Sequence, residues 1–202
     1  MAIRLKSKWH RSRRARNQAR ANKPKSLDDL SGVLSFNIWK ISHEIFRRME
    51  KEGFRFAEDA QVTLFIQEFI AFLVHMIDRR IYGYWDDDKR HAFINLVSTQ
   101  LTGNMVENQI DLLGPGDHEQ AMTALLNARF EDYAECAYDD NGPGFEARRF
   151  LALKISDILA QTDNRWVIEQ VMDIEIPYAL EMVLRLAVDA LGLRPRANPA
   201  NQ

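Results

Sequence analysis

The chain has 202 residues, of which 46% are hydrophobic and 28% are charged, and it has a single cysteine, Cys136. This composition is typical of a globular protein that can bury a core without a metal ion, and one cysteine excludes a disulfide framework within the chain. The longest apolar run, residues 62–81, is interrupted by polar and charged side chains, and no hydrophobic signal segment follows the N-terminus, so a cytoplasmic protein is expected.

The net charge of −2 is the sum of a basic N-terminal segment and an acidic remainder of the chain. Residues 1–25 contain ten Lys and Arg and no Asp or Glu, which leaves 17 basic against 29 acidic residues, a net charge of about −12, in the rest of the chain. Because like charges repel and few apolar residues accompany them, we expect residues 1–25 to form an extended or fluctuating basic arm.

Three interpretations of the arm remain open. It can bind a polyanion such as nucleic acid, since Lys and Arg displace counterions from phosphates. It can attach to an anionic membrane surface. It can also be a solubilising arm, or one that lies on an acidic face of its own bundle or of a neighbour. The candidate polyanion-binding residues are Arg11, Arg13, Arg14, Arg16 and Arg20.

Apolar residues at three- and four-residue steps predict the first two helices after the arm. The first is expected over 27–52, opened by Ser26 as N-cap, with Asp29 in an approximate capping box, and ended by Gly53. The second is expected over 57–82 and is apolar most of the way round, which indicates a central helix or one covered by a partner.

Four further helices are predicted, over 87–113, 118–138, 145–161 and 164–191. The glycines and prolines of 114–116 and 142–144 separate them, and Pro177 predicts a kink or break near 173–177 in the last one. No segment alternates as a strand would. The fold class is therefore all-α: a single helical bundle of about six helices over 26–193, with a basic N-terminal arm and a disordered tail over 194–202.

Known catalytic motifs are missing from the sequence. There is no glycine-rich nucleotide loop and no nucleophile elbow. Cys136 lies among carboxylates, which should raise the pKa of its thiol, so we expect a small residue beside the core. The neighbouring acidic cluster can take a cation, receive the basic arm or remain a solvated face; its members are Glu131, Asp132, Glu135, Asp139 and Asp140.

A metal site is a second hypothesis, because helical bundles often hold carboxylate and histidine ligands. Glu68 and His75 share a face of one predicted helix, and His91 and Glu175 are candidates from two others. The alternative for Glu68 and His75 is a pair of boundary residues that form hydrogen bonds. Glu175 lies on an apolar face, so it must be paired, hydrogen-bonded or protonated; Arg129, Arg148 or backbone groups freed by Pro177 are candidate partners.

Tyr82, Tyr84 and Trp85 follow the second predicted helix and can act as interface anchors or as lids over the core. The leading hypothesis is a non-enzymatic interaction or regulatory protein that binds a macromolecular partner. The arm attaches by charge, and the 57–82 helix with these aromatic residues provides a dimer face or a partner groove. The alternatives are a metal- or small-molecule-binding bundle and a peripheral membrane protein. No cofactor is predicted.

Overall fold

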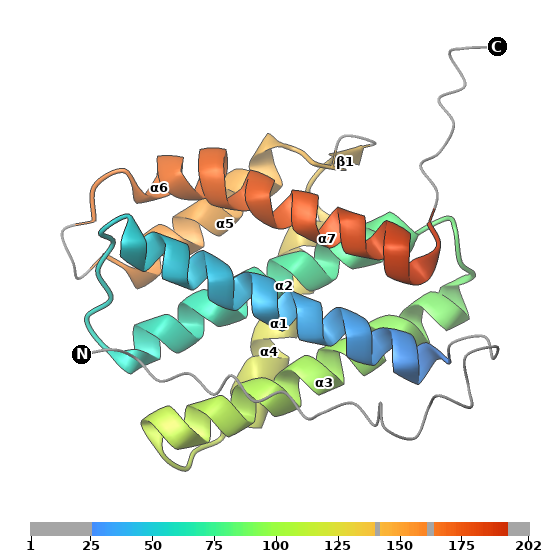
Figure 1. Ribbon diagram of the computed structural model, residues 1–202, viewed down its shortest axis with the longest axis horizontal. Coiled ribbons are helices and arrows are strands. Elements are labelled where there is room, and N and C mark those ends of the chain that lie inside the picture. Colours follow the sequence, from blue (N-terminus) through green and yellow to red (C-terminus); the bar gives the residue numbers. More distant parts are fainter. Residues whose placement is uncertain (1–25, 140–141, 161–163, 194–202) are drawn as a thin grey trace.

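The computed structural model describes residues 26–139, 142–160 and 164–193. The predicted basic arm, 1–25, and the predicted tail, 194–202, lie outside the described residues. The described chain is an all-α bundle, as predicted (Figure 1). Its elements are α1 (Leu27–Lys51), α2 (Asp59–Ile81), α3 (Asp87–Leu113), α4 (His118–Ala134), β1 (Tyr138–Asp139), β2 (Gly142–Pro143), α5 (Phe145–Ile158), α6 (Val167–Gln170), the π-helical segment η3 (Val171–Glu175) and α7 (Ile176–Leu191).

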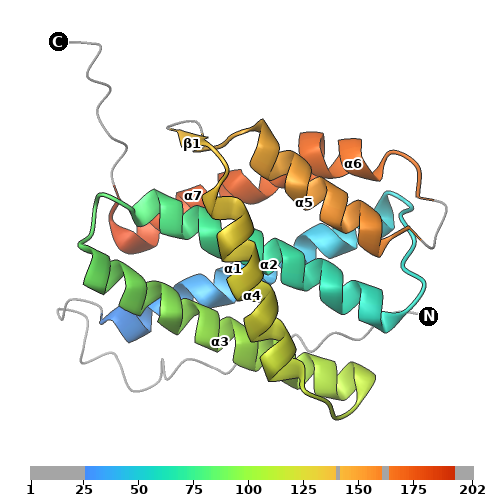
Figure 2. The ribbon, with the colours of Figure 1, turned by 180° about the vertical axis from the view of Figure 1, so that it is seen from behind.

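Helix α2 is the centre of the bundle. It contacts α1, α3, α4, α5 and α7, and it is buried along most of its length. α1 and α7 cover one side, whereas α4 crosses α2 and α3 on the other (Figures 1 and 2). By length and composition α2 is also the one described helix that qualifies as a membrane span, but 89% of its apolar window is buried inside the bundle, as in the core helix of a soluble protein.

The capping box at the start of α1 forms as predicted. Ser26 Oγ accepts a hydrogen bond from the Asp29 N–H at 3.1 Å, and the Asp29 carboxylate accepts one from the Ser26 N–H at 3.3 Å. The first turns of α1 are tied to the middle of α3, because Gln100 Nε2 donates to Ser31 Oγ at 3.1 Å. The apolar residues that recur at three- and four-residue steps along this helix are buried: Leu34, Ile38, Ile41, Ile45 and Met49.

Pro177 does not break the last helix. α6, η3 and α7 follow one another without interruption, and the chain widens to a π-helix over η3, immediately before the proline. The Ile176 N–H donates to the Val171 carbonyl, five residues back. Pro177 has no N–H and its ring would clash with the carbonyl four residues earlier, so the wider turn accommodates the proline where a kink or break was expected.

Helix α4 ends at Ala134, four residues before its predicted end. Tyr138 and Asp139 instead pair with Gly142 and Pro143 in a short antiparallel ladder. Ala137, which the predicted helix included, is exposed, and its carbonyl accepts a hydrogen bond from the Gly144 N–H at 2.8 Å.

Candidate functional site: the groove between α3 and α4

A groove runs between α3 and α4, with a volume of about 660 Å³. One face of α3 forms one wall, through residues spaced three and four apart, and α4 forms the other. The polar members of the lining are mostly hydroxyl and amide side chains: Asn95, Ser98, Thr99, Thr102, Thr123 and Asn127. Ile94, Leu126 and Phe130 supply the apolar part of the surface. A volume of this size is typical of ligand-binding clefts.

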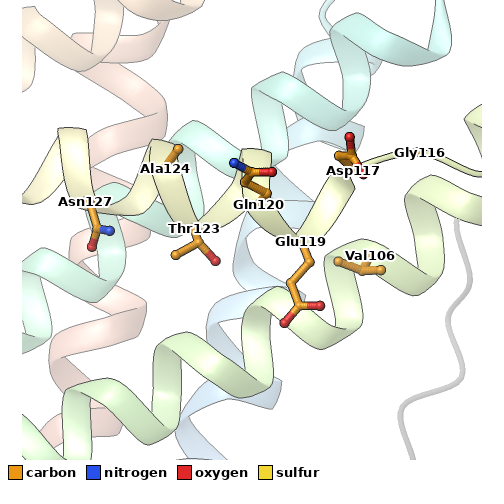
Figure 3. Close-up of a pocket in the computed structure, with 8 residues that line it drawn as sticks. All are labelled: Val106, Gly116, Asp117, Glu119, Gln120, Thr123, Ala124 and Asn127. Atoms are coloured by element: carbon orange, nitrogen blue, oxygen red, sulfur yellow. The ribbon is translucent and has the colours of Figure 1, made fainter.

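A second hollow, of about 670 Å³, adjoins the groove at the turn that joins α3 to α4. The two share Val106, Glu119, Thr123 and Asn127. Figure 3 shows Glu119, Thr123 and Asn127 along the side of α4 that faces α3. Gly116 and Asp117 of the turn also line this hollow.

One end of the groove is closed by an ion-paired arginine. Arg90 Nη1 lies 2.7 and 2.9 Å from the two carboxylate oxygens of Asp78 on α2, and Arg90 Nη2 lies 3.2 Å from Asp87. Arg90 Nη2 also lies 3.0 Å from His91 Nε2. Because a guanidinium only donates, Nε2 of His91 is the acceptor in this contact, which places the ring proton on Nδ1. The charge of Asp78 is thus neutralised within the protein.

A second arginine fixes α4 against the centre of the bundle. Arg129 Nε and Nη2 each donate to one oxygen of Glu68 at 2.7 Å, and Arg129 Nη1 donates to Asp132 at 2.9 Å. The side chain of Glu68 is 5% exposed. This bidentate ion pair compensates the negative charge of the buried carboxylate, so Glu68 is a structural residue.

His75 packs between Phe130 and Tyr133 of α4, with ring centroids 5.8 and 5.5 Å away. Burial, and to a smaller extent the positive charge of Arg79, lowers the pKa of His75 to about 4. The ring is therefore neutral near pH 7. Burial, followed by the charge of Glu68, also raises the pKa of the Tyr133 hydroxyl. Neither Nδ1 of His75 nor the Tyr133 hydroxyl has a hydrogen-bond partner within the described part of the chain.

Glu175 is fully buried in the π-helical segment, on the far side of α2 from the groove. Arg48 of α1 donates to it through Nε at 2.8 Å, and Gln170 through Nε2 at 2.9 Å. The guanidinium of Arg48 also lies 4.4 Å from the centre of the Tyr178 ring. The expectation that Glu175 is paired is confirmed. Its partner is Arg48, whereas Arg129 and Arg148 were the predicted candidates.

The four predicted metal ligands do not come together. Glu68 is bound by Arg129, Glu175 by Arg48, His75 is enclosed by aromatic rings, and His91 lies at the groove beside Arg90. Across the residues that the structure describes, no group of three or more His, Cys, Asp or Glu side chains is gathered so as to hold a metal ion. The ion pair of Glu68 with Arg129 was not predicted, and an arginine was predicted for Glu175 but not Arg48.

The three aromatic residues after α2 play different parts. Trp85 is half-buried, with its ring centroid 5.1 Å from that of Phe93, and Tyr84 packs against the core. Tyr82 is 55% exposed. Trp85 and Tyr84 therefore fit the prediction of lids over the core, whereas the guanidinium groups of Arg79 and Arg90 lie 5.9 and 5.2 Å from the centre of the Tyr82 ring.

The acidic groups around Cys136 behave as expected. Burial raises the pKa of its thiol, with additional contributions from Glu146, Asp132 and Glu135. This disfavours the thiolate that a nucleophile needs. The described members of the acidic cluster lie on α4 and its exit, and Asp140 lies outside the described residues.

Sequence reasoning did not identify the groove. The polar face of α3 that carries His91, Asn95, Thr99 and Thr102 was visible as residues three to four apart beside an apolar stripe. This polar pattern is typical of any solvated helix face. It becomes a wall of the groove only because α4 crosses α3 at this place. The predicted polyanion-binding residues Arg11, Arg13, Arg14, Arg16 and Arg20 lie outside the described residues.

Comparison with known proteins gives no matching family model, no matching curated protein and no matching solved structure.

Proposed function

We propose that the chain is a non-enzymatic interaction protein that binds a macromolecular partner by charge, with residues 1–25 contacting a polyanion. The observation that carries the proposal is the separation of charge along the chain. Ten basic residues precede the bundle, whereas residues 86–139, which include α3 and α4, contain eleven acidic and three basic residues, a net charge of −8. The net charge of this segment is two thirds of the net charge of −12 outside the arm.

The environments of the titratable groups favour an interaction protein over an enzyme. Glu68 and Glu175 each form an ion pair with an arginine. These pairs stabilise the bundle and make both carboxylates unsuitable for proton transfer. His75 is a neutral ring between two aromatic side chains. A general acid or base needs a pKa near the working pH and access to a substrate, and these three residues lack that access.

Nucleic acid is the polyanion we favour. Lys and Arg bind phosphates by releasing counterions, so the logarithm of the binding constant falls linearly with the logarithm of the salt concentration. The test is a gel shift of the full chain with a double-stranded DNA oligonucleotide over a salt series, beside co-sedimentation with anionic vesicles. The test variant replaces five arginines by glutamine: Arg11, Arg13, Arg14, Arg16 and Arg20. A matched control replaces five exposed basic residues of the bundle by glutamine: Lys40, Arg47, Lys51, Arg149 and Arg185.

We expect the arm variant to lose most of its DNA affinity and its salt slope to shrink by roughly 4, because each phosphate contact contributes about 0.9 to the slope. The control variant should keep a slope close to that of the unmodified chain. Binding to vesicles but not to DNA would replace nucleic acid by a membrane surface. Equal losses in both variants, or no binding to either probe, would refute the proposal.

A further inference from the structure

We infer that the groove between α3 and α4 is a docking site for the basic segment 1–25 of the same chain, so that an external polyanion and the groove compete for the arm. The inference rests on the proposed function, since the competitor is the polyanion named there. It assigns a partner to the groove: a short arginine-rich stretch of polypeptide.

Charge complementarity is the first argument. Within residues 86–139 the basic side chains are Lys89, Arg90 and Arg129. Arg90 is paired with Asp78 and Asp87, and Arg129 is paired with Glu68 and Asp132. The segment nevertheless keeps a net charge of −8. Asp117 and Glu119 line the hollow at the α3–α4 turn, and both are exposed. Ten positive charges at the front of the chain match this surface.

The chemistry of the lining is the second argument. Hydroxyl and amide oxygens of Ser98, Thr99, Thr123 and Asn127 can accept the several N–H donors of a guanidinium. The apolar part of the groove suits the methylene stems of Arg and Lys, which bury against apolar surface while the charged head stays in water. A volume of about 660 Å³ accommodates a short stretch of chain, and not the whole arm.

Connectivity is the third argument, and it favours the same chain over a second copy. The arm joins α1 at Ser26, and the first turns of α1 are hydrogen-bonded to the middle of α3 through Ser31 with Gln100 and through Ser35 with the Val97 carbonyl. Groove residues Thr99 and Thr102 belong to the same turns of α3. A helix with its side chains is about 10 Å across, whereas 25 extended residues span up to roughly 80 Å. A tethered segment this close has a high effective concentration at the groove.

The direct test is site-specific photo-crosslinking in the full-length chain. A benzophenone amino acid is placed at Thr99 or Asn127 in the groove and, as a control, at Asp173, which is exposed in η3. The η3 segment joins α6 to α7, and these helices lie across the bundle from α3 (Figures 1 and 2). After irradiation at low salt, monomer and dimer bands are separated, and the linked peptides are identified by mass spectrometry.

We expect the groove positions to link to residues 1–25 in the monomer band and the Asp173 position to give at least fivefold less of that product. A molar excess of the DNA oligonucleotide should abolish the groove product. Links to 1–25 only in the dimer band would overturn docking in the same chain, and no enrichment over Asp173 would overturn the groove as the site. Retention of the product at DNA concentrations that saturate binding would overturn the competition.

A second measurement separates this inference from the proposed function. Asp117→Asn with Glu119→Gln removes two charges from the hollow, and Asp117 forms no side-chain capping bond that this change would break. Its matched control, Glu169→Gln with Asp173→Asn, removes two exposed charges from α6 and η3. We expect the groove variant to bind DNA roughly threefold more tightly than the control, because two surface ion pairs that hold the arm are lost. Equal DNA affinities in the two variants would refute docking and leave the proposed function standing, whereas absence of DNA binding by the unmodified chain would refute the proposed function.

Discussion

Replacing Arg129 by methionine should leave the carboxylate of Glu68 inside the bundle without its charged partner. The side chain of Glu68 is 5% exposed and receives two hydrogen bonds of 2.7 Å from Arg129. Removing one member of a buried pair typically costs 3–5 kcal/mol. The side chain of Arg129 is 16% exposed, so we expect the lower end, a loss of about 3 kcal/mol in the free energy of unfolding. For a chain of this size that corresponds to a decrease in Tm of roughly 6–12 °C.

The double variant Glu68→Met with Arg129→Met separates the lost pair from the lost packing. Both side chains are then apolar and of similar length, so we expect a loss of less than about 1 kcal/mol relative to the unmodified protein. Asp132→Asn is the control for the second ion pair of Arg129. Asp132 is 39% exposed, and its replacement should cost less than about 1 kcal/mol.

The assay is urea unfolding of the unmodified protein and all three variants at pH 7, followed by circular dichroism. A double variant as unstable as Arg129→Met, or a single-variant loss below about 1 kcal/mol, would refute the pairing as the reason for the burial of Glu68.

Three further predictions concern other parts of the bundle. His75 has a folded-state pKa of about 4 against 6.5 when unfolded, so its contribution, roughly 3 kcal/mol, is complete above pH 6.5 and is lost as the pH falls towards 4. His75→Phe should flatten this acid limb in unfolding experiments; a limb as steep as that of the unmodified protein would contradict the origin in His75. Arg48→Met should cost about 2–4 kcal/mol in urea unfolding, because Glu175 is 0% exposed and retains only the amide of Gln170; a loss within error of zero would refute the ion pair with Arg48 as the support of this buried carboxylate. Ser26→Ala should cost about 1 kcal/mol in the same measurement by removing the N-cap bond, and Ser26→Asn should restore most of it.

The sequence alone determined the helical nature of the bundle and most of its helix ends. Caps and turns depend on a few adjacent residues, so the sequence shows them directly. Examples are the N-caps Ser26, with Asp29, and Asp86, and the helix-ending glycines Gly53 and Gly114. The bounds predicted for the third helix, 87–113, coincide with those of α3 for this reason. The same local chemistry identified Pro177 as a site of disturbance.

Only the tertiary structure decided which charges meet. Arg48 and Glu175 are 127 residues apart, and Arg129 and Glu68 are 61 apart, so their pairing depends on how the helices cross. The same holds for the groove, whose two walls become a surface only when α4 crosses α2 and α3 (Figure 2). Helical periodicity specifies the face on which a residue lies. Which face of a neighbouring helix that residue meets depends on how the whole core packs, and no local sequence pattern encodes this packing.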